Sequence, residues 1–300
     1  MDLPALPSSV AIRDVGPRDG LQPEAPVAVG DRVRLVEALV AAGVVRIEAV
    51  AFVSPTAVPA MAGAAEVLAA VPRAGGVRYS ALVPNVRGAE LALECEIDEL
   101  TVTASMSEAY SQRNVHMSVD ESADAIAEIC KVAGDVPVDA VLSCSFGSPY
   151  EGDVAPREVA ELAMRLRDSG CAAITCADTT GMATPRRVAE VIDAVGADIG
   201  LHLHETRGTA LVCAYAGMQL GVTRFDTSVG GLGGSPFAAG AAGNLATEEL
   251  VALLDDLGVA TGISVDGLIG AARLAGELVG RPVPSRVATA GPRTRRHEEG

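Results

Sequence analysis

The chain has 300 residues, of which 49% are hydrophobic, so it can bury a large core. Its formal net charge of −16 excludes a general binder of nucleic acid or of an anionic membrane, because phosphate groups need a basic surface. Aromatic residues make up only 3% of the chain and Trp is absent, which also argues against base-stacking platforms.

Short β-rich runs alternate with segments of helical period along the whole chain. We expect strands near 10–15, 46–52, 77–83, 98–104, 138–145, 172–177, 199–204 and 224–229. Helical patterns between them include 31–42, 120–133, 156–169, 184–195 and 209–220, and two more follow the last strand at 247–257 and 266–279. Eight such units predict an α/β fold, a (β/α)8 TIM barrel with extra C-terminal helices. The competing open, doubly wound sheet would show a glycine-rich fingerprint after the first strand, which residues 16–20 do not fit.

No composition break divides the chain, so we expect a single domain over 1–285 and a short polar tail over 286–300. The six cysteines form no CxxC pair and fall mostly in apolar segments, which is typical of buried thiols in a reducing compartment. The first residues lack the basic and apolar regions of a signal peptide, and no apolar run is long enough to span a bilayer. We therefore expect a cytoplasmic protein that binds neither membrane nor nucleic acid.

Polar residues interrupt the expected strand ends, where the reactive groups of a barrel gather. His202 and His204 are two residues apart in the apolar run 199–204, so both imidazoles would project to the same side of a strand. Together with Asp19 and Asn244 they offer two nitrogens and two oxygens, which suits a divalent cation such as Mg²⁺, Mn²⁺, Co²⁺ or Zn²⁺. The alternative for the two histidines is a structural role, and taken singly Asp19 is more often a turn residue and Asn244 more often a helix cap.

Glu48 lies in an otherwise apolar strand and needs a cation, for which Arg18 is the natural partner. The pair is either purely structural or holds the guanidinium toward a developing oxyanion. The glycine-rich segment 230–244 is either a flexible connector or a lid at the barrel mouth.

The chain resembles the hydroxymethylglutaryl-CoA lyase family, metal-dependent barrels that cleave carbon–carbon bonds beside a carbonyl, over about residues 10–285. The resemblance rests on several motifs in the same order: VGPRDGLQ at 15–22, FVSP at 52–55, LVPN at 82–85, SPYEG at 148–152, DT at 178–179, GLGG at 231–234 and GNLATE at 243–248.

This resemblance implies a role for each matching residue. The metal ligands would be Asp19, His202, His204 and Asn244, and the cation would be Mg²⁺ or Mn²⁺ in preference to Zn²⁺ or Co²⁺. Arg18 would stabilise the enolate of the departing acetyl-CoA, Glu48 would position that arginine, Asp178 would shape the polar site, and His202 would also transfer protons. The predicted substrate-binding residues are Gln22, Asn85 and Arg207.

Two positions depart from the family pattern. The family's mobile loop carries a cysteine where this chain has Ser235, and a serine hydroxyl is a far weaker acid than a thiol. Glu205 and Arg207 stand where the family usually has Asp and an aromatic residue, and Arg207 adds a cation at the mouth that could contact a carboxylate or phosphate.

The resemblance implies a divalent-metal-dependent lyase that cleaves 3-hydroxy-3-methylglutaryl-CoA, or a related 3-hydroxy acyl-CoA, to acetyl-CoA and a 3-oxo acid. The expected partners are the acyl-CoA substrate and a second copy of the chain in a homodimer. Two alternatives stay open: an aldolase or condensing enzyme acting on 2-oxo acids, and a non-catalytic acyl-CoA-binding homologue.

Overall fold

The computed structural model describes residues 6–73, 75–234 and 242–296. Within them, eight parallel strands close into a barrel in chain order, each paired with its sequence neighbours and β1 with β8. The strands are β1 (Ala11–Asp14), β2 (Arg46–Ala51), β3 (Arg78–Leu82), β4 (Glu99–Ser105), β5 (Val138–Ser143), β6 (Ala173–Ala177), β7 (Gly200–His202) and β8 (Arg224–Thr227). The predicted (β/α)8 TIM barrel is confirmed.

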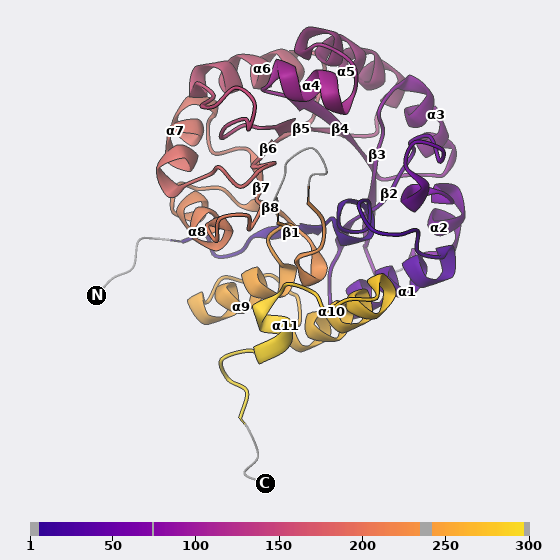
Figure 1. Cartoon of the computed structure of the whole chain (residues 1–300), viewed down its shortest axis with the longest axis vertical. Helices are drawn as coiled ribbons and strands as arrows, with labels where there is room; N and C mark the ends of the chain where they lie inside the picture. Colours follow the sequence, from indigo (N-terminus) through magenta and orange to yellow (C-terminus); the bar gives the residue numbers. More distant parts are fainter. Residues whose placement is uncertain (1–5, 74, 235–241, 297–300) are drawn as a thin grey trace.

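Helices form a ring around the barrel (Figure 1). They are α1 (Val29–Ala41), α2 (Ala64–Ala70), α3 (Val86–Glu94), α4 (Glu108–Asn114), α5 (Val119–Ala133), α6 (Pro156–Asp168), α7 (Pro185–Val195) and α8 (Ala210–Gln219), with a short 3-10 helix at Pro59–Met61. Helix α5 shows how these form: Ser118 accepts from the Glu121 amide and the Glu121 carboxylate accepts from the Ser118 amide, a complete capping box. No helix in the described part of the chain is both long and apolar enough to cross a membrane.

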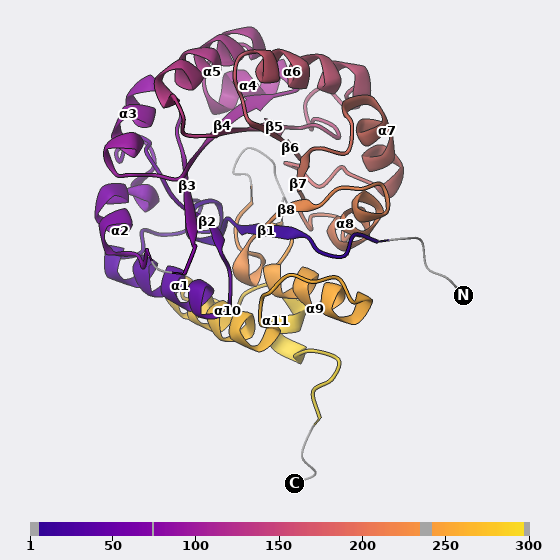
Figure 2. The ribbon, with the colours of Figure 1, turned by 180° about the vertical axis from the view of Figure 1, so that it is seen from behind.

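Three further helices follow the barrel: α9 (Thr247–Leu257), α10 (Val265–Val279) and α11 (Arg286–Ala290). Both views show them together on the side of the ring where the first and last barrel units meet (Figure 2). The segment 286–300, predicted as a polar tail, thus begins with a helix. Its start has a physical cause, because the Ser285 hydroxyl caps the Ala288 amide and the Ala288 side chain is buried.

The turn after β1 is a π-helix, η1 (Gly16–Gly20), in which the amides of Gly20 and Leu21 donate to carbonyls five residues back. Both terminal glycines are required by close packing. A Cβ on Gly16 would lie 2.8 Å from Asp14 Oδ1, and one on Gly20 would lie 2.7 Å from Ser228 Oγ. This wide turn carries Arg18 and Asp19 at the carboxyl end of the barrel.

Part of the barrel interior is charged rather than aliphatic. Arg13 of β1 is buried among carboxylates of three other strands, Glu99, Asp139 and Asp226. The aliphatic core lies mainly between the strands and the helices, where β-strand residues such as Leu100 and Ile174 are fully buried. Removing one partner of a buried ion pair is strongly destabilising. The ion pairs of Arg13 with these three acids therefore hold β1, β4, β5 and β8 together.

Two buried carboxylates support the turns beneath the barrel mouth. Asp14 accepts from the Gly16 amide and the Thr247 hydroxyl, and Glu248 accepts from the Gly230 amide. Burial raises the pKa of Asp14 to about 7 and that of Glu248 to about 7. Both groups therefore bind protons more strongly in the folded chain than in the unfolded one, and between about pH 4.5 and 7 each makes folding less favourable as pH rises.

We expect Glu248→Gln to remove part of this pH dependence. The amide can still accept from Gly230 but never ionises, so the free energy of unfolding should fall less between pH 5 and pH 8 than in the wild type, by on the order of 2–3 kcal/mol. Urea denaturation at both pH values measures the difference, with exposed Glu66→Gln as the control. Equal pH slopes for Glu248→Gln and the wild type would contradict the assignment.

Candidate metal centre and active site

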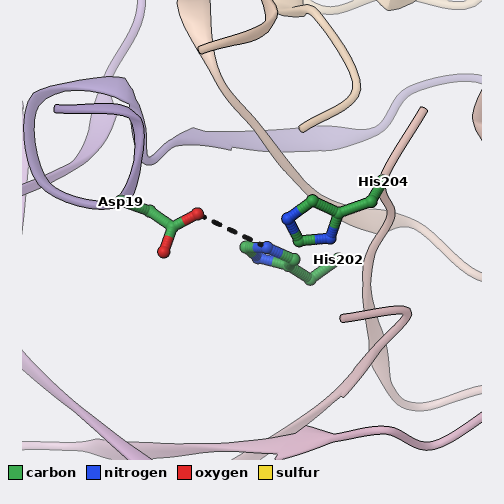
Figure 3. A group of neighbouring side chains, drawn as sticks. All are labelled: Asp19, His202 and His204. Atoms are coloured by element: carbon green, nitrogen blue, oxygen red, sulfur yellow. Dashed lines mark ion pairs between the residues drawn. The ribbon is translucent and has the colours of Figure 1, made fainter. Parts of the chain in front are cut away.

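Asp19, His202 and His204 meet at the carboxyl end of the barrel, with one potential ligand atom of each lying within 4.8 Å of the others. Figure 3 shows the carboxylate from η1 pointing toward the two imidazoles from β7 and the residues after it, with His202 Nε2 3.9 Å from Asp19 Oδ2. Strand β7 ends at His202, two residues earlier than predicted. His204 lies just beyond it in an isolated antiparallel bridge with Asn244, so the two histidines do not share one strand.

Each imidazole has its Nδ1 engaged by a fixed acceptor. His204 Nδ1 lies 2.9 Å from the Asp178 carbonyl oxygen, and His202 Nδ1 lies 3.3 Å from Asp226 Oδ2. Because a carbonyl or carboxylate oxygen can only accept, both Nδ1 atoms carry a proton, and in the neutral form of each ring the lone pair lies on Nε2. Histidines that ligate metals are held in this way in proteins.

The electrostatics favour ligation at neutral pH. Burial and the neighbouring His202 lower the pKa of His204 to about 4, so this imidazole is neutral. Burial opposes ionisation of Asp19, but the charge of Arg18, the neighbouring His202 and the hydrogen bond from Asn244 outweigh it and lower the pKa of this carboxyl to about 2. The site therefore presents an anionic oxygen and a neutral imidazole, the forms in which both residue types bind metal ions.

Asn244 completes the predicted ligand set. Its Nδ2 donates to Asp19 Oδ2 at 2.7 Å and to the Leu232 carbonyl at 3.0 Å, while its Oδ1 is buried without a hydrogen-bond partner. An amide oxygen left without a partner beside a carboxylate and two imidazoles fits a fourth ligand for a divalent cation. The helix-cap alternative is excluded, because α9 begins at Thr247 and its N-cap is Ala246.

Arg18 and Glu48 form a buried ion pair beside this cluster. The guanidinium contacts Glu48 Oε2 through Nε and Nη2, and Nη1 donates to Asp19 Oδ1 at 2.7 Å. Glu48 is fully buried and its other oxygen has no partner, so the carboxylate serves this arginine. Although burial disfavours the cation, the charges of Glu48 and Asp19 raise the pKa of Arg18, which stays protonated.

A cavity of about 250 Å³ opens at the cluster. Its polar lining includes Arg18, Asp19, Gln22 and both histidines, so Gln22 lies where a substrate-binding residue is expected. The rest is largely apolar and comes from the ends of β3, β4 and β5 and from α4 and α5; it includes Leu82, Val102, Tyr110, Ile126, Ile129 and Val141. The cavity therefore offers a charged end and an apolar wall.

The Asp178 side chain does not line this cavity. Its Oδ1 accepts from the amides of Met182 and Ala183 at 2.6 and 3.0 Å, and its Oδ2 is buried without a partner. Burial raises the pKa of Asp178 to about 6. The side chain fixes the loop after β6, whose Asp178 carbonyl accepts from His204, and a role of this carboxylate in the polar site stays a prediction.

Asn85 and Arg207, both predicted to bind substrate, also have other contacts. Asn85 caps α3 by accepting from the Gly88 amide at 2.9 Å. Arg207 donates to the carbonyls of Thr180 and Gly181 at 2.8 and 2.9 Å. Neither side chain lines the cavity, so substrate contact by either stays a prediction. Ser235 lies outside the described residues.

Two residues that support the site were not predicted from the sequence, Asp226 and Arg13. Asp226 was detectable in principle, because Arg224 and Asp226 alternate with apolar Phe225 in the eighth strand and so face the barrel interior together. The partner of that inward carboxylate comes from β1, more than 200 positions away, and no local pattern reveals it.

A closed barrel that brings two histidines, a carboxylate and an arginine to one cavity at the carboxyl ends of its strands defines a class, the (β/α)8 barrels with a candidate metal centre at that end. A family model described as HMGL-like matches residues 9–275, so the chain belongs to this family, and the resemblance seen in the sequence is confirmed.

Similar proteins support the same assignment. Over 293 residues the chain is 42% identical to the 3-hydroxy-3-isohexenylglutaryl-CoA/hydroxymethylglutaryl-CoA lyase of Pseudomonas aeruginosa, covering 95% of this chain and 98% of that protein. A crystal structure of hydroxymethylglutaryl-CoA lyase from P. aeruginosa covers the same shares at 42% identity with a TM-score of 0.92. An HMG-CoA lyase of A. baumannii in complex with coenzyme A and 3-methylmalate has 36% identity and a TM-score of 0.93, covering 99% of this chain and all of that one.

Proposed function

We propose that the protein is a carbon–carbon lyase that cleaves 3-hydroxy-3-methylglutaryl-CoA or a related 3-hydroxy acyl-CoA. The observation that carries the proposal is the ion-paired guanidinium of Arg18, which lines the same cavity as Asp19, His202 and His204. In this cleavage the bond between C2 and C3 breaks and its electron pair passes to the thioester as the enolate of acetyl-CoA. The C3 hydroxyl loses its proton to become the carbonyl of the 3-oxo acid, and C2 takes up one proton.

Different residues at the cavity would assist different parts of this reaction. A divalent cation held by Asp19, His202, His204 and Asn244, Mg²⁺ or Mn²⁺ in our proposal, would lower the pKa of the C3 hydroxyl and hold its oxygen. Arg18 places a permanent cation where the thioester oxygen gains charge, and Glu48 fixes the direction of its N–H groups. The donors of Arg18 that Glu48 and Asp19 do not use remain available to that oxygen.

The apolar wall of the cavity indicates which substituent on the acyl group of the substrate would fit. Leu82, Val102 and Val141 offer no polar partner, so they suit a hydrocarbon substituent better than a second charged group. The similar P. aeruginosa protein is named for both an isohexenyl and a methyl substrate. We therefore include 3-hydroxyglutaryl-CoA esters with a larger apolar group at C3 in the substrate class.

Release of acetyl-CoA from each glutaryl-CoA, with Mg²⁺ or Mn²⁺ added and then removed by a chelator, tests the proposal. We expect metal-dependent release of one acetyl-CoA per substrate consumed. Condensation of a 2-oxo acid without release of acetyl-CoA would favour an aldolase or synthase. Binding of acyl-CoA without turnover would favour a non-catalytic homologue.

A homodimer and a cytoplasmic location also belong to this proposal. Sedimentation tests the oligomeric state, and cell fractionation tests the location.

The loop serine gives a separate prediction. If proton delivery to C2 uses this loop position, Ser235→Cys should raise kcat on 3-hydroxy-3-methylglutaryl-CoA and make turnover sensitive to thiol-blocking reagents, because a thiol is the stronger acid near neutral pH. Ser235→Ala, which has neither group, is the control for reagent effects on the six native cysteines. Unchanged kcat in both variants would show that this side chain carries no proton in the reaction.

A further inference from the structure

Among the described residues, Asp226 joins the charged layer inside the barrel to the candidate metal centre. Arg13 donates from Nε to Asp226 Oδ1 at 2.8 Å and from Nη2 to Asp226 Oδ2 at 2.7 Å, a two-point contact across the β1–β8 pair. The same Asp226 Oδ2 lies 3.3 Å from His202 Nδ1. All three residues are buried, each at most 6% exposed.

Arg13 also binds two acids that have no contact with the histidines. Its Nη1 donates to Glu99 Oε1 at 2.8 Å, and its Nη2 lies 2.8 Å from Asp139 Oδ2. Asp139 in turn accepts from the Thr175 hydroxyl. Asp226 and Asp139 are thus two aspartates on the same arginine, and of this pair Asp226 is the one that also contacts a proposed metal ligand.

We propose that Asp226, locked by Arg13, is a positioning residue that fixes the tautomer of His202. With both carboxylate oxygens held by an arginine that can only donate, the carboxylate presents Oδ2 to His202 as an acceptor. The ring must then carry its proton on Nδ1 and leave the Nε2 lone pair toward Asp19. This inference rests on the proposed metal site but not on the identity of the reaction.

The substitution Asp226→Asn separates this role from simple support of the barrel. Arg13 offers only N–H groups, so it would take the single amide oxygen, and the amide NH₂ would face His202 Nδ1 as a donor. The ring would have to accept at Nδ1 and move its proton to Nε2, the atom needed for ligation. We expect the affinity for Mn²⁺ to fall about 10–100-fold, the range typical of lost partners of ligating histidines.

Asp139→Asn is the matched control. It removes one charge from the same arginine but leaves the two-point contact with Asp226 and the His202 contact in place. We expect its Mn²⁺ affinity to stay within about twofold of the wild type. Equal losses of affinity in both variants would overturn the inference, because the effect would then arise from the charge around Arg13.

A measurement on the unaltered protein covers the case in which Asp226→Asn does not fold. Nitrogen-15 NMR of the metal-free wild type, at a pH where the imidazole is neutral, should show the His202 proton on Nδ1. A proton on Nε2 would overturn the inference. If the wild type shows the Nδ1 proton but binds no divalent cation, the proposed metal site fails while the positioning of His202 by Asp226 stands.

Discussion

Replacing Arg18 with lysine should lower kcat by about 10²–10³-fold while KM changes little. The physical reason is geometric, because the planar guanidinium contacts Glu48 through two nitrogens and Asp19 through the third. A lysine ammonium is a point charge on a flexible stem and cannot keep those contacts while also facing an oxyanion. Loss of one well-placed oxyanion donor has an effect of this size in other enzymes.

Steady-state kinetics of acetyl-CoA release measure this effect. Arg34→Lys, at an exposed arginine paired with Asp31, is a control for the change of residue type. A variant in which only KM rises would assign Arg18 to substrate binding and contradict its role in stabilising the enolate.

His204→Ala should abolish stoichiometric binding of a divalent cation together with nearly all lyase activity. The substitution removes one of two imidazoles and leaves Asp19 next to an alanine methyl group, so the remaining donors are too few to hold the ion. Titration with Mn²⁺ followed by electron paramagnetic resonance counts the bound ion directly. His116→Ala, at an exposed histidine, is the control. Retention of one ion and of the wild-type rate in His204→Ala would show that the ligand set is wrong.

The sequence predicted the barrel because its evidence is local and repeated. The strands are short β-rich runs, the longer helices are periodic, and the alternation of the two holds around the closed sheet. The short helices α2 and α4, and α3, were not predicted. The π-helix at Gly16–Gly20 was not predicted, and the close packing that requires its second glycine involves Ser228, far away in the sequence. The fold is thus contained in short-range patterns, whereas the shape of the turn that carries Arg18 and Asp19 depends on tertiary packing.

The candidate site was predicted in part for the same reason. The motif around Asp19 and the His202–His204 pair can be recognised in the sequence from residue type and spacing, and the structure brings the three side chains together. Asn85 and Arg207 stand out equally, but their side chains also have local partners, a helix N-cap contact and two loop carbonyls, so a contact of either with substrate stays a prediction. Asp226 was not predicted because its importance depends on a contact with Arg13 from the other end of the chain.

The hydrogen bond between Asn244 and Asp19 joins residues 225 positions apart in the chain. A ribosome makes Asp19 early and Asn244 only after all eight barrel strands, so the set of four candidate ligands is complete only once the chain has been made as far as Asn244. A product that ends before Asn244 would therefore lack one of the four proposed ligands. The order of synthesis thus places completion of the candidate ligand set after synthesis of the whole barrel sheet.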